Sequence, residues 1–374
     1  MKKTFAIIVV FIITFTSVSI SAENIKKTTN IKNTDLPSYF CYRNINGTDY
    51  TTPIVNQAPA PTCEAYALCA ALETIMQYQR KEIFTPDLSE THLYFYAGGT
   101  YQAGYVSVID AANYLVETGV PDEGCYPDPH RPYDYPFISL DGWENRTVKI
   151  NEWGYVENTQ EAIKTALIKH GPLVFCAMFW KDFHYYKEGV YEHRWGPISG
   201  GHVMTIFGYD DNQQCWICKN SAGTDWGEAG WWKMSYDAGM ITDSWYKRVD
   251  ANWTGIIYIN GSYGNIKPDV PKVYIQNPKI FKTYMHGQEF SMIFKNLEIF
   301  QKAAPRIIGN ITIDVTAENA DLVEFYIDGI RAHIDYEAPY IWDLETERGR
   351  HTLMVKAKNE SNESLDIIDF YKLL

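Results

Sequence analysis

Cys63 is the residue of this chain with the clearest capacity for covalent chemistry. It stands in "NQAPAPTCEAYALCAALE", residues 56–73, where a proline-broken loop runs into a cysteine at the start of an apolar helix. A thiol attacks as its thiolate, and the unpaired N–H groups and aligned peptide dipoles at a helix N-terminus stabilise that negative charge. Cys63 is therefore a candidate nucleophile.

Three other side chains supply what a thiolate needs to attack a carbonyl group, namely a proton-transfer partner and donors for the oxyanion. His202, in "SGGHVMTIFGYD", is the candidate general base. Gln57 lies six residues before Cys63 and can donate its side-chain amide to the oxyanion, with the Cys63 N–H as the second donor. Asn220, in "CWICKNSAGTDWGEAGWW", is the candidate acceptor that holds the imidazole in one tautomer.

Each of these residues alone has a plainer explanation. A cysteine at a helix start is more often a buried or disulfide-bonded residue, and a single histidine in a strand is usually structural. Asn220 or Gln57 by itself would indicate nothing. Their joint appearance in this order favours a catalytic cluster.

Helices precede strands in the part of the chain that carries these residues. Apolar side chains at three- and four-residue steps predict a helix from Cys63, and two more are predicted over 105–119 and 159–171, the last with Thr159 as N-cap and Gly171 as its end. This order of helices and strands indicates an α+β fold. Short β-branched or aromatic runs predict strands of an antiparallel sheet or small barrel at 172–180, 200–210, 213–221 and 230–236.

The composition excludes several classes of partner. The net charge is −13 with Lys and Arg scattered along the chain, so nucleic acid and anionic membranes are poor partners. The length of 374 residues, 46% of them apolar, allows a sizeable core, and a prior of about 150 residues per domain suggests two domains.

The N-terminus predicts export. "MKKTFAIIVVFIITFTSVSISAE" is typical of a secretory signal peptide cleaved near Ala22, because its apolar run is shorter than the roughly 20 residues of a spanning helix. An uncleaved anchor stays open as an alternative. No later segment is apolar enough to span a bilayer, so no membrane span is expected in the mature chain, which we expect to be secreted or held on the cell surface.

Cysteines and sequons agree with export. Export makes disulfides feasible, and the odd number of cysteines leaves at least one of them unpaired. The Asn-x-Ser/Thr triplets give weak support, since such triplets also arise by chance. The seven cysteines are at 41, 63, 69, 125, 176, 215 and 218, and the seven sequons begin at Asn46, Asn145, Asn252, Asn260, Asn310, Asn359 and Asn362.

A second domain is predicted after the Gly/Pro-containing linker "GSYGNIKPDVPK". Its runs alternate apolar and polar residues and are separated by turn signals such as "DG" and "RGR", which predicts a small β-sandwich without helices. The predicted strands lie at 310–317, 323–330, 351–359 and 365–373.

The chain resembles the papain-like cysteine peptidases over about residues 37–255. Besides the two stretches around Cys63 and His202, the ordered matches are "LSETHLYFYAGG", "YPDP", "IKHGPLVFCAMFWKDFHYYKEGVY" and "KNSAGTDWGEAGWWKM". The resemblance implies a two-lobed catalytic domain, with a helical lobe and an antiparallel β-barrel lobe, that acts on a protein or peptide without a cofactor. It implies Cys63 as nucleophile, His202 as general base and later acid, Asn220 as orienting residue and Gln57 as oxyanion donor.

Two departures from the family pattern fall at the site itself. Glu64 follows the nucleophile where the family usually has Trp, and Pro61-Thr62 precede it in place of Gly-Ser. A carboxylate beside a thiolate raises the thiol pKa unless solvent or a cation screens it. Ala222 stands where the family has a Trp that shelters the Asn–His hydrogen bond. Catalysis is therefore expected to be weakened or retuned.

Other positions bear on disulfides and substrate binding. Ala60 and Tyr96 stand where the family pairs two cysteines, so that bridge is absent. Gly98 and Gly99 resemble glycines that let an extended substrate lie along the cleft, and an ordinary turn explains them equally well. Trp226 matches a second family Trp and completes the substrate-binding candidates.

No metal site is predicted. His184, His193 and His202 recur at nine-residue intervals, but their contexts share no ligand-like local geometry.

The C-terminal part resembles the immunoglobulin-like modules of prokaryotic surface and secreted proteins over about residues 270–374. The resemblance implies an all-β Ig-like sandwich that acts as a spacer, as an adhesion module for an extracellular ligand, or as a substrate-docking module. The predicted organisation is a signal peptide at 1–22, a flexible leader at 23–36, a papain-like domain at 37–262, a linker at 263–272 and the Ig-like domain at 273–374.

Together these resemblances imply a secreted or cell-surface cysteine endopeptidase that works through a Cys-His-Asn triad. Two alternatives stay open. One is a papain-fold binding or adhesion protein that the changes at Glu64 and Ala222 have silenced, and the other is a transamidase or peptide-ligating enzyme that uses the same residues.

Overall fold

The computed structural model describes residues 36–58, 60–100, 105–128, 139–242, 255–264, 266, 269–280, 282–290 and 304–374. The chain divides into two units, Met1–Leu36 and Pro37–Leu374, and the described residues after Leu36 belong to the second. The predicted signal peptide and all but the last residue of the predicted leader lie outside the described residues.

The helices gather in the first part of this unit. The three predicted helices are confirmed, and in α4 the hydroxyl of the predicted N-cap Thr159 accepts the N–H of Ala162. α3 begins later than predicted, because Ser107 caps its N-terminus. The α-helices are α1 Cys63–Arg80, α2 Glu90–Tyr96, α3 Val108–Glu117 and α4 Gln160–His170, and the 3₁₀ helices are η3 Glu123–Cys125, η4 Trp143–Arg146 and η5 Lys181–Tyr185.

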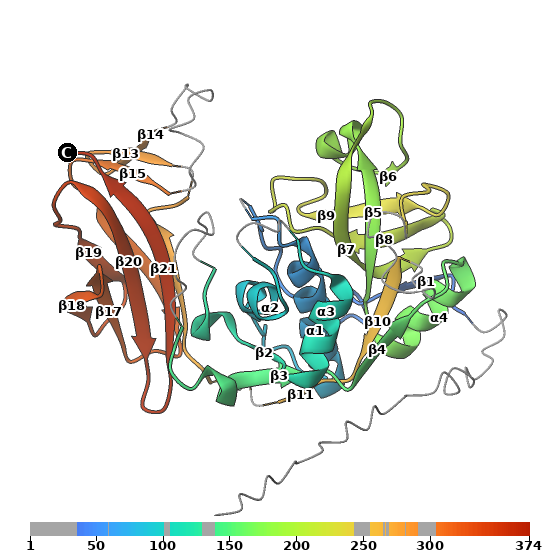
Figure 1. Cartoon of the computed structure of the whole chain (residues 1–374), viewed down its shortest axis with the longest axis horizontal. Coiled ribbons are helices and arrows are strands. Elements are labelled where there is room, and N and C mark those ends of the chain that lie inside the picture. The colour runs from blue at the N-terminus through green and yellow to red at the C-terminus, as the bar shows by residue number, and fades with distance from the viewer. Residues whose placement is uncertain are drawn as a thin grey trace, which may run out of the picture. The chain divides into compact units, whose positions relative to one another are not determined.

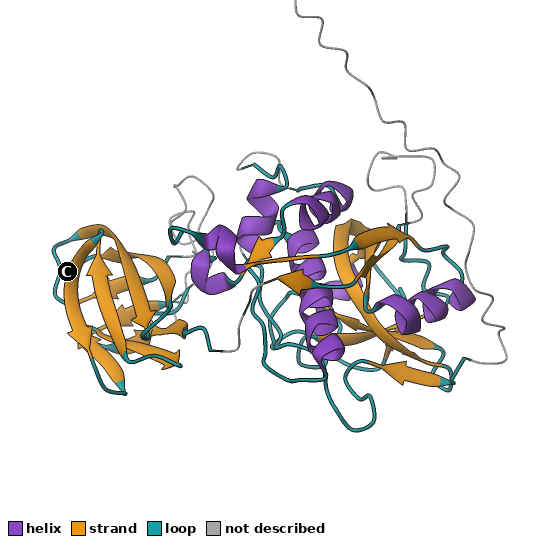
Figure 2. Ribbon diagram, turned by 90° about the horizontal axis from the view of Figure 1, so that it is seen from below, coloured by secondary structure: helices purple, strands orange, loops and turns teal. Residues whose placement is uncertain are grey.

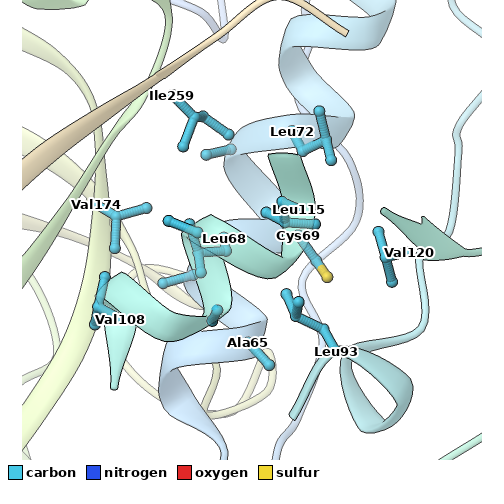
Figure 3. Close-up of a cluster of buried hydrophobic side chains, with 14 of the residues drawn as sticks. Ala65, Leu68, Cys69, Leu72, Leu93, Val108, Leu115, Val120, Val174 and Ile259 are labelled. Carbon is cyan, nitrogen blue, oxygen red and sulfur yellow. The ribbon is translucent and has the colours of Figure 1, made fainter. Parts of the chain in front are cut away.

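α1 is the centre of the helical part of the core. Every residue from Cys63 to Gln77 is buried, which requires a helix that is largely apolar all round. Leu68 and Leu72 pack with side chains of α2, α3 and β5, and Figure 3 shows the cluster from the side of α3. The packing fixes α1, and with it the position of Cys63 at the first turn.

Beside the helices lies a mostly antiparallel sheet (Figure 1). Its strand order is β4-β10-β5-β7-β8-β9-β6 with β1 paired to β7, and the one parallel pair among these described strands is β6–β9. The strands predicted at β5, β7, β8 and β9 are confirmed, and the result is the expected α+β class. The bounds are β1 Tyr39–Cys41, β4 Glu152–Tyr155, β5 Leu173–Trp180, β6 Val190–Tyr191, β7 Ile198–Asp210, β8 Cys215–Lys219, β9 Trp231–Ser235 and β10 Ile256–Asn260, with a small sheet of β2 Val120–Pro121, β3 Thr147–Lys149 and β11 Tyr263–Gly264.

The C-terminal residues form two further sheets that share one hydrophobic core. All elements described after β11 are strands, as Figure 2 shows in orange, and the four predicted strands there are confirmed. Two parallel pairs, β13–β15 and β15–β21, were not predicted. The smaller sheet is β12 Lys272–Asn277, β16 Thr312–Glu318 and β19 Tyr340–Asp343, and the larger is β14 Gln288–Phe290, β13 Thr283–Met285, β15 Arg306–Ile308, β21 Glu363–Lys372, β20 Gly349–Lys358, β17 Leu322–Ile327 and β18 Ile330–Asp335.

The C-terminal strands contact the helical part of the chain directly. A small apolar cluster joins Cys125 and Leu140 to Leu365 and Ile367 of β21. Beside it, Arg146 pairs with Asp122 at 2.5 Å and donates to the Ser364 hydroxyl at 3.1 Å and to the Glu363 carbonyl. The two regions are therefore packed on each other within the second unit.

None of the seven cysteines, all of which are among the described residues, is in a disulfide, and all seven are buried. No helix of the described residues has both the length and the apolar character that crossing a bilayer requires.

Candidate active site

Cys63 is the first residue of α1 and is only 6% exposed. Burial raises the pKa of its thiol well above the usual value, the neighbouring Glu64 carboxylate raises it further, and a hydrogen bond from the Val203 N–H lowers it. The helix N-terminus favours a thiolate, but here the loss of solvent and the adjacent negative charge outweigh it. The resting thiol is therefore protonated at neutral pH.

Glu64 is fully buried, with 0% of its surface exposed. After burial itself, its charge raises the pKa of Tyr94 and of the Cys176 thiol on β5, as it does that of Cys63. The carboxylate thus lies inside the protein close to both thiols, where solvent does not screen it. The rise in thiol pKa expected from the sequence is present.

His202 and Asn220 lie side by side where β7 and β8 meet. The imidazole Nε2 is 2.8 Å from Asn220 Oδ1, and the Ser221 N–H donates to the same oxygen at 2.8 Å. Since Oδ1 accepts, Nε2 must carry the proton and donate. In the neutral ring Nδ1 is then the basic nitrogen. Burial lowers the pKa of His202, the bond to Asn220 raises it, and the nearby His184 lowers it.

Ser221, which was not predicted as a site residue, connects Gln57 to this pair. The Gln57 N–H donates to the Ser221 carbonyl at 3.0 Å, and the Ser221 hydroxyl donates to Gln57 Oε1 at 2.5 Å. Gln57 Nε2 donates to the Ala60 carbonyl at 2.9 Å, which leaves its second N–H for another acceptor. The sequence signal that could have identified Ser221 as a site residue is its position directly after Asn220.

Phe179 of β5 packs against the ring of His202. The Phe179 and His202 rings are 6.0 Å apart at 69°, and His184 lies 5.1 Å from Phe179. Ala222 is exposed. Phe179 therefore supplies an apolar contact to the imidazole from β5. No local pattern indicated this contact, because it depends on the β5–β7 register, in which Ala177 lies opposite His202.

No hydrogen bond joins the Cys63 sulfur to the His202 ring, both of which are among the described residues. The hydrogen-bonding neighbours of the sulfur are instead the Glu64 side chain, which raises the thiol pKa, and the N–H of Val203, the residue next to His202, which lowers it. The nucleophile candidate and the base candidate thus lie on adjoining elements, α1 and β7, and both are uncharged at neutral pH. Catalytic hydrogen bonds are often long before substrate binds and tighten in the complex.

The three substrate-binding candidates lie in different surroundings. Gly98 is exposed at φ +105° with nothing near the position of a Cβ, whereas a Cβ on Gly99 would come 2.5 Å from the Tyr94 carbonyl. Close packing alone therefore accounts for Gly99. Trp226 is half-buried and packs on Phe183, to whose carbonyl its Nε1 donates at 3.3 Å.

The other two histidines of the nine-residue series have local partners. His184 Nε2 lies 2.8 Å from the Ser199 hydroxyl, and His193 Nδ1 lies 3.1 Å from Asp182. Within the described ranges, no group of three His, Cys, Asp or Glu side chains is arranged to hold a metal ion.

Comparisons with known proteins found one family model and several similar proteins. The family model described as papain family cysteine protease matches residues 36–246, more than half of the chain. Cathepsin B-like CP3 of Giardia intestinalis is 45% identical over 76 residues, 20% of this chain and 25% of that protein. Cathepsin M of Mus musculus is 27% identical over 227 residues, 54% of this chain and 63% of that protein. The crystal structure of xylellain, a cysteine protease from Xylella fastidiosa, is 19% identical with a TM-score of 0.49 and covers 61% of this chain and 87% of that one.

The chain spans only part of these relatives. The matches to Giardia intestinalis proteins cover 25% to 34% of their lengths.

Proposed function

Because the chain belongs to the papain family of cysteine proteases, we propose that it is an endopeptidase that cleaves peptide bonds with Cys63, His202, Asn220 and Gln57. The observation that carries the proposal is the 2.8 Å contact between His202 Nε2 and Asn220 Oδ1, beside a cysteine at a helix N-terminus. The contact leaves Nδ1 as the nitrogen that can accept a proton.

In the proposed reaction, His202 Nδ1 takes the thiol proton as the Cys63 sulfur attacks the substrate carbonyl carbon. The oxyanion of the tetrahedral intermediate accepts hydrogen bonds from the free Gln57 N–H and from the Cys63 backbone N–H. His202 then gives its proton to the departing amine, which leaves a thioester on Cys63. A water that gives a proton to His202 hydrolyses the thioester and restores the thiol.

Replacement of Cys63 by Ala tests this proposal. The variant should lose hydrolysis of an unfolded protein substrate while its thermal unfolding stays that of the parent. Cys69→Ala is the matched control, because Cys69 is a buried cysteine of the same helix that faces the core. Continued cleavage by the Cys63→Ala protein would refute the proposal.

A silenced binding protein is the second candidate, and one observation favours it. Cys63 is 6% exposed, the buried Glu64 raises its pKa, and no hydrogen bond links it to His202. A thiol-directed epoxide distinguishes the two candidates. Labelling of Cys63 in proportion to the loss of peptidase activity supports the peptidase, and an unlabelled Cys63 in a folded protein supports the silenced form.

We further propose that the chain is exported and that residues 273–374 form an Ig-like module. The signal-like N-terminus supports the first proposal, and the two sheets around one core support the second. N-terminal sequencing of the mature protein checks export, since a start near Glu23 is expected. An experimental structure would check the strand order of the module.

A further inference from the structure

A cavity of about 660 Å³ lies between the helical part of the chain and the C-terminal strands. Its size falls in the range of about 300–1,000 Å³ that is usual for ligand pockets. Asn56, the neighbour of Gln57, and the exposed Asp225 lie on its wall, and so does Tyr66, one turn along α1 from Cys63. The wall is therefore built partly from residues close in the chain to Gln57 and Cys63, although neither of these two residues lines the cavity.

The two sides of the cavity carry charged side chains of mostly different sign. The helical side supplies carboxylates, and the C-terminal side supplies three lysines and one aspartate. Two of these lysines already have partners, since Lys272 donates to the Thr85 carbonyl at 2.6 Å and Lys282 pairs with Glu289 at 2.6 Å. The charged lining residues are Asp87, Glu90, Asp122, Glu123, Asp128, Asp225, Lys272, Lys279, Lys282 and Asp366.

Several of the acids are also accounted for. Tyr274 donates to Asp87 at 3.0 Å, Tyr66 donates to Asp128 at 2.8 Å, and Arg146 pairs with Asp122. The Tyr274–Asp87 contact joins the two walls of the cavity. Asp366 accepts from the Ile275 N–H at 2.7 Å and Asp225 is exposed, so the two glutamates are the remaining buried acids.

Glu90 and Glu123 are those two. Glu90 is 6% exposed, accepts from its own backbone N–H, and has no cationic partner among the described side chains. Glu123 Oε1 accepts from the Asp128 N–H, but its buried Oε2 has no hydrogen-bond partner in the part of the chain that the structure describes. A buried carboxylate without a cation is unfavourable, so a positive ligand group would be stabilised here.

We propose that this cavity binds a lysine or arginine side chain of the peptide substrate, with Glu90 and Glu123 as the anionic partners. The apolar lining, which includes Phe84 and Val273, suits the alkyl stem of such a side chain. A metal ion fits less well, because the described residues contain no group of three ligands arranged to hold one. The inference rests on the proposed peptidase activity and adds a substrate class to it.

Binding of the cation should release a proton. Burial, followed by neighbouring carboxylates, raises the pKa of both Glu90 and Glu123 well above the ordinary value. Both carboxyls therefore hold their protons to higher pH than an ordinary glutamate, and an ammonium or guanidinium group that displaces a proton gains a charged partner. Affinity should increase as the pH rises from 6 to 8.

The first experiment measures binding without cleavage. The full-length Cys63→Ala protein is titrated calorimetrically, in two buffers of different ionisation enthalpy, with a blocked Ala-Ala-Lys-Ala-Ala peptide and with its norleucine counterpart. We expect at least tenfold tighter binding of the lysine peptide, and buffer-dependent heats that report proton release. Equal affinities would overturn the proposal, whether or not the protein is a peptidase.

The variants locate the binding. Glu90→Gln, in the Cys63→Ala background, should lower the affinity for the lysine peptide at least tenfold and leave the norleucine peptide unchanged. Glu161→Gln is the matched control, because Glu161 is likewise a first-turn acid of a helix but does not line the cavity. Asp225→Asn changes an exposed residue of the lining and serves as the second variant if Glu90→Gln does not fold. It should weaken binding of the lysine peptide by a smaller factor than Glu90→Gln does. Unchanged affinity in the folded variants overturns the assignment.

The last experiment tests whether the lysine that binds in the cavity belongs to the peptide that is cleaved or to a different peptide. A series of peptide substrates is made in which a single lysine occupies each position in turn on both sides of the scissile bond. At least one position should raise kcat/KM tenfold in the wild type but not in Glu90→Gln. Binding of free lysine peptide without any such position would overturn the substrate assignment.

Discussion

At the scale of single residues, the environment of the thiol distinguishes this site. Burial first, and the adjacent carboxylate of the buried Glu64 second, raise the pKa of the Cys63 thiol. The effect is opposite to that of the helix N-terminus, which favours the thiolate. A protonated thiol reacts slowly with electrophiles until the substrate or a proton transfer changes its surroundings.

Glu64→Gln should therefore speed alkylation of Cys63. The substitution removes a negative charge beside the sulfur while it keeps the side-chain shape, so the thiol pKa should fall. Each decrease of one pKa unit should raise the thiolate fraction, and the rate with iodoacetamide at pH 7, about tenfold. The midpoint of the rate–pH curve should move to lower pH. A midpoint that stays in place would show that Glu64 does not control the thiol.

Phe179 is expected to position the imidazole. Phe179→Ala should lower kcat/KM about tenfold or more, because a small displacement of a reacting group is costly. It should also let water reach His202, which weakens the burial effect that lowers its pKa, so the acidic limb of the pH profile should move to higher pH. Phe179→Tyr should restore both values. An unshifted pH profile in Phe179→Ala would contradict this role.

At the scale of elements, the helix starts and caps that neighbouring residues specify could be predicted from the sequence, whereas the pairing of strands distant in the chain could not. The start of α1 at Cys63 and the N-cap Thr159 follow from neighbouring residues, and both were predicted. α2 was missed as a helix, because its seven residues, ETHLYFY, are too few to display a helical period. The contact of Phe179 with His202 and the β13–β15–β21 pairings depend on register, which no local pattern encodes.

The joint between β21 and the helical part is also an element-scale feature. Arg146 and Asp122 have side chains only 14% and 11% exposed, and Arg146 also binds Ser364 of β21. Arg146→Ala should lower the free energy of unfolding by about 3 kcal/mol, because it leaves a buried carboxylate without its partner. Urea unfolding measures the change. Arg43→Ala, at an exposed position, is the control and should have a smaller effect. A loss below about 0.5 kcal/mol for Arg146→Ala, the usual size of a surface substitution, would contradict the structural joint.

At the scale of the whole molecule, the C-terminal strands belong to the same packed unit as the active-site region. A spacer would tolerate removal, whereas here β21 covers Cys125 and Leu140 and forms one side of the acidic cavity. Burial at this place keeps several carboxyls away from solvent, and their protonation links the stability of the unit to pH. The carboxyls whose pKa burial raises are Glu73, Asp87, Glu90 and Glu123.

The protein should therefore lose stability as the pH rises from about 5 to 8. Above the ordinary glutamate pKa of about 4.3, the folded state holds protons that the unfolded state has lost, so the unfolding free energy falls with increasing pH. Glu324 acts in the opposite direction at low pH. Burial works against its ionisation, but hydrogen bonds from Lys358, Tyr326 and Arg331 lower its pKa to about 2. The melting temperature should peak near pH 5, and a monotonic rise to pH 8 would contradict the buried acids.

The most direct measurement is detection of the acyl-enzyme. Wild-type protein is mixed with a slowly deacylating ester substrate, quenched in acid within the first turnover and analysed by intact and peptide mass spectrometry. We predict one acyl group per molecule, carried as a thioester on Cys63 and absent from the His202→Ala variant. Product formation without acylation of Cys63, or acylation of a different cysteine, would contradict the central claim that Cys63 and His202 form the reactive pair.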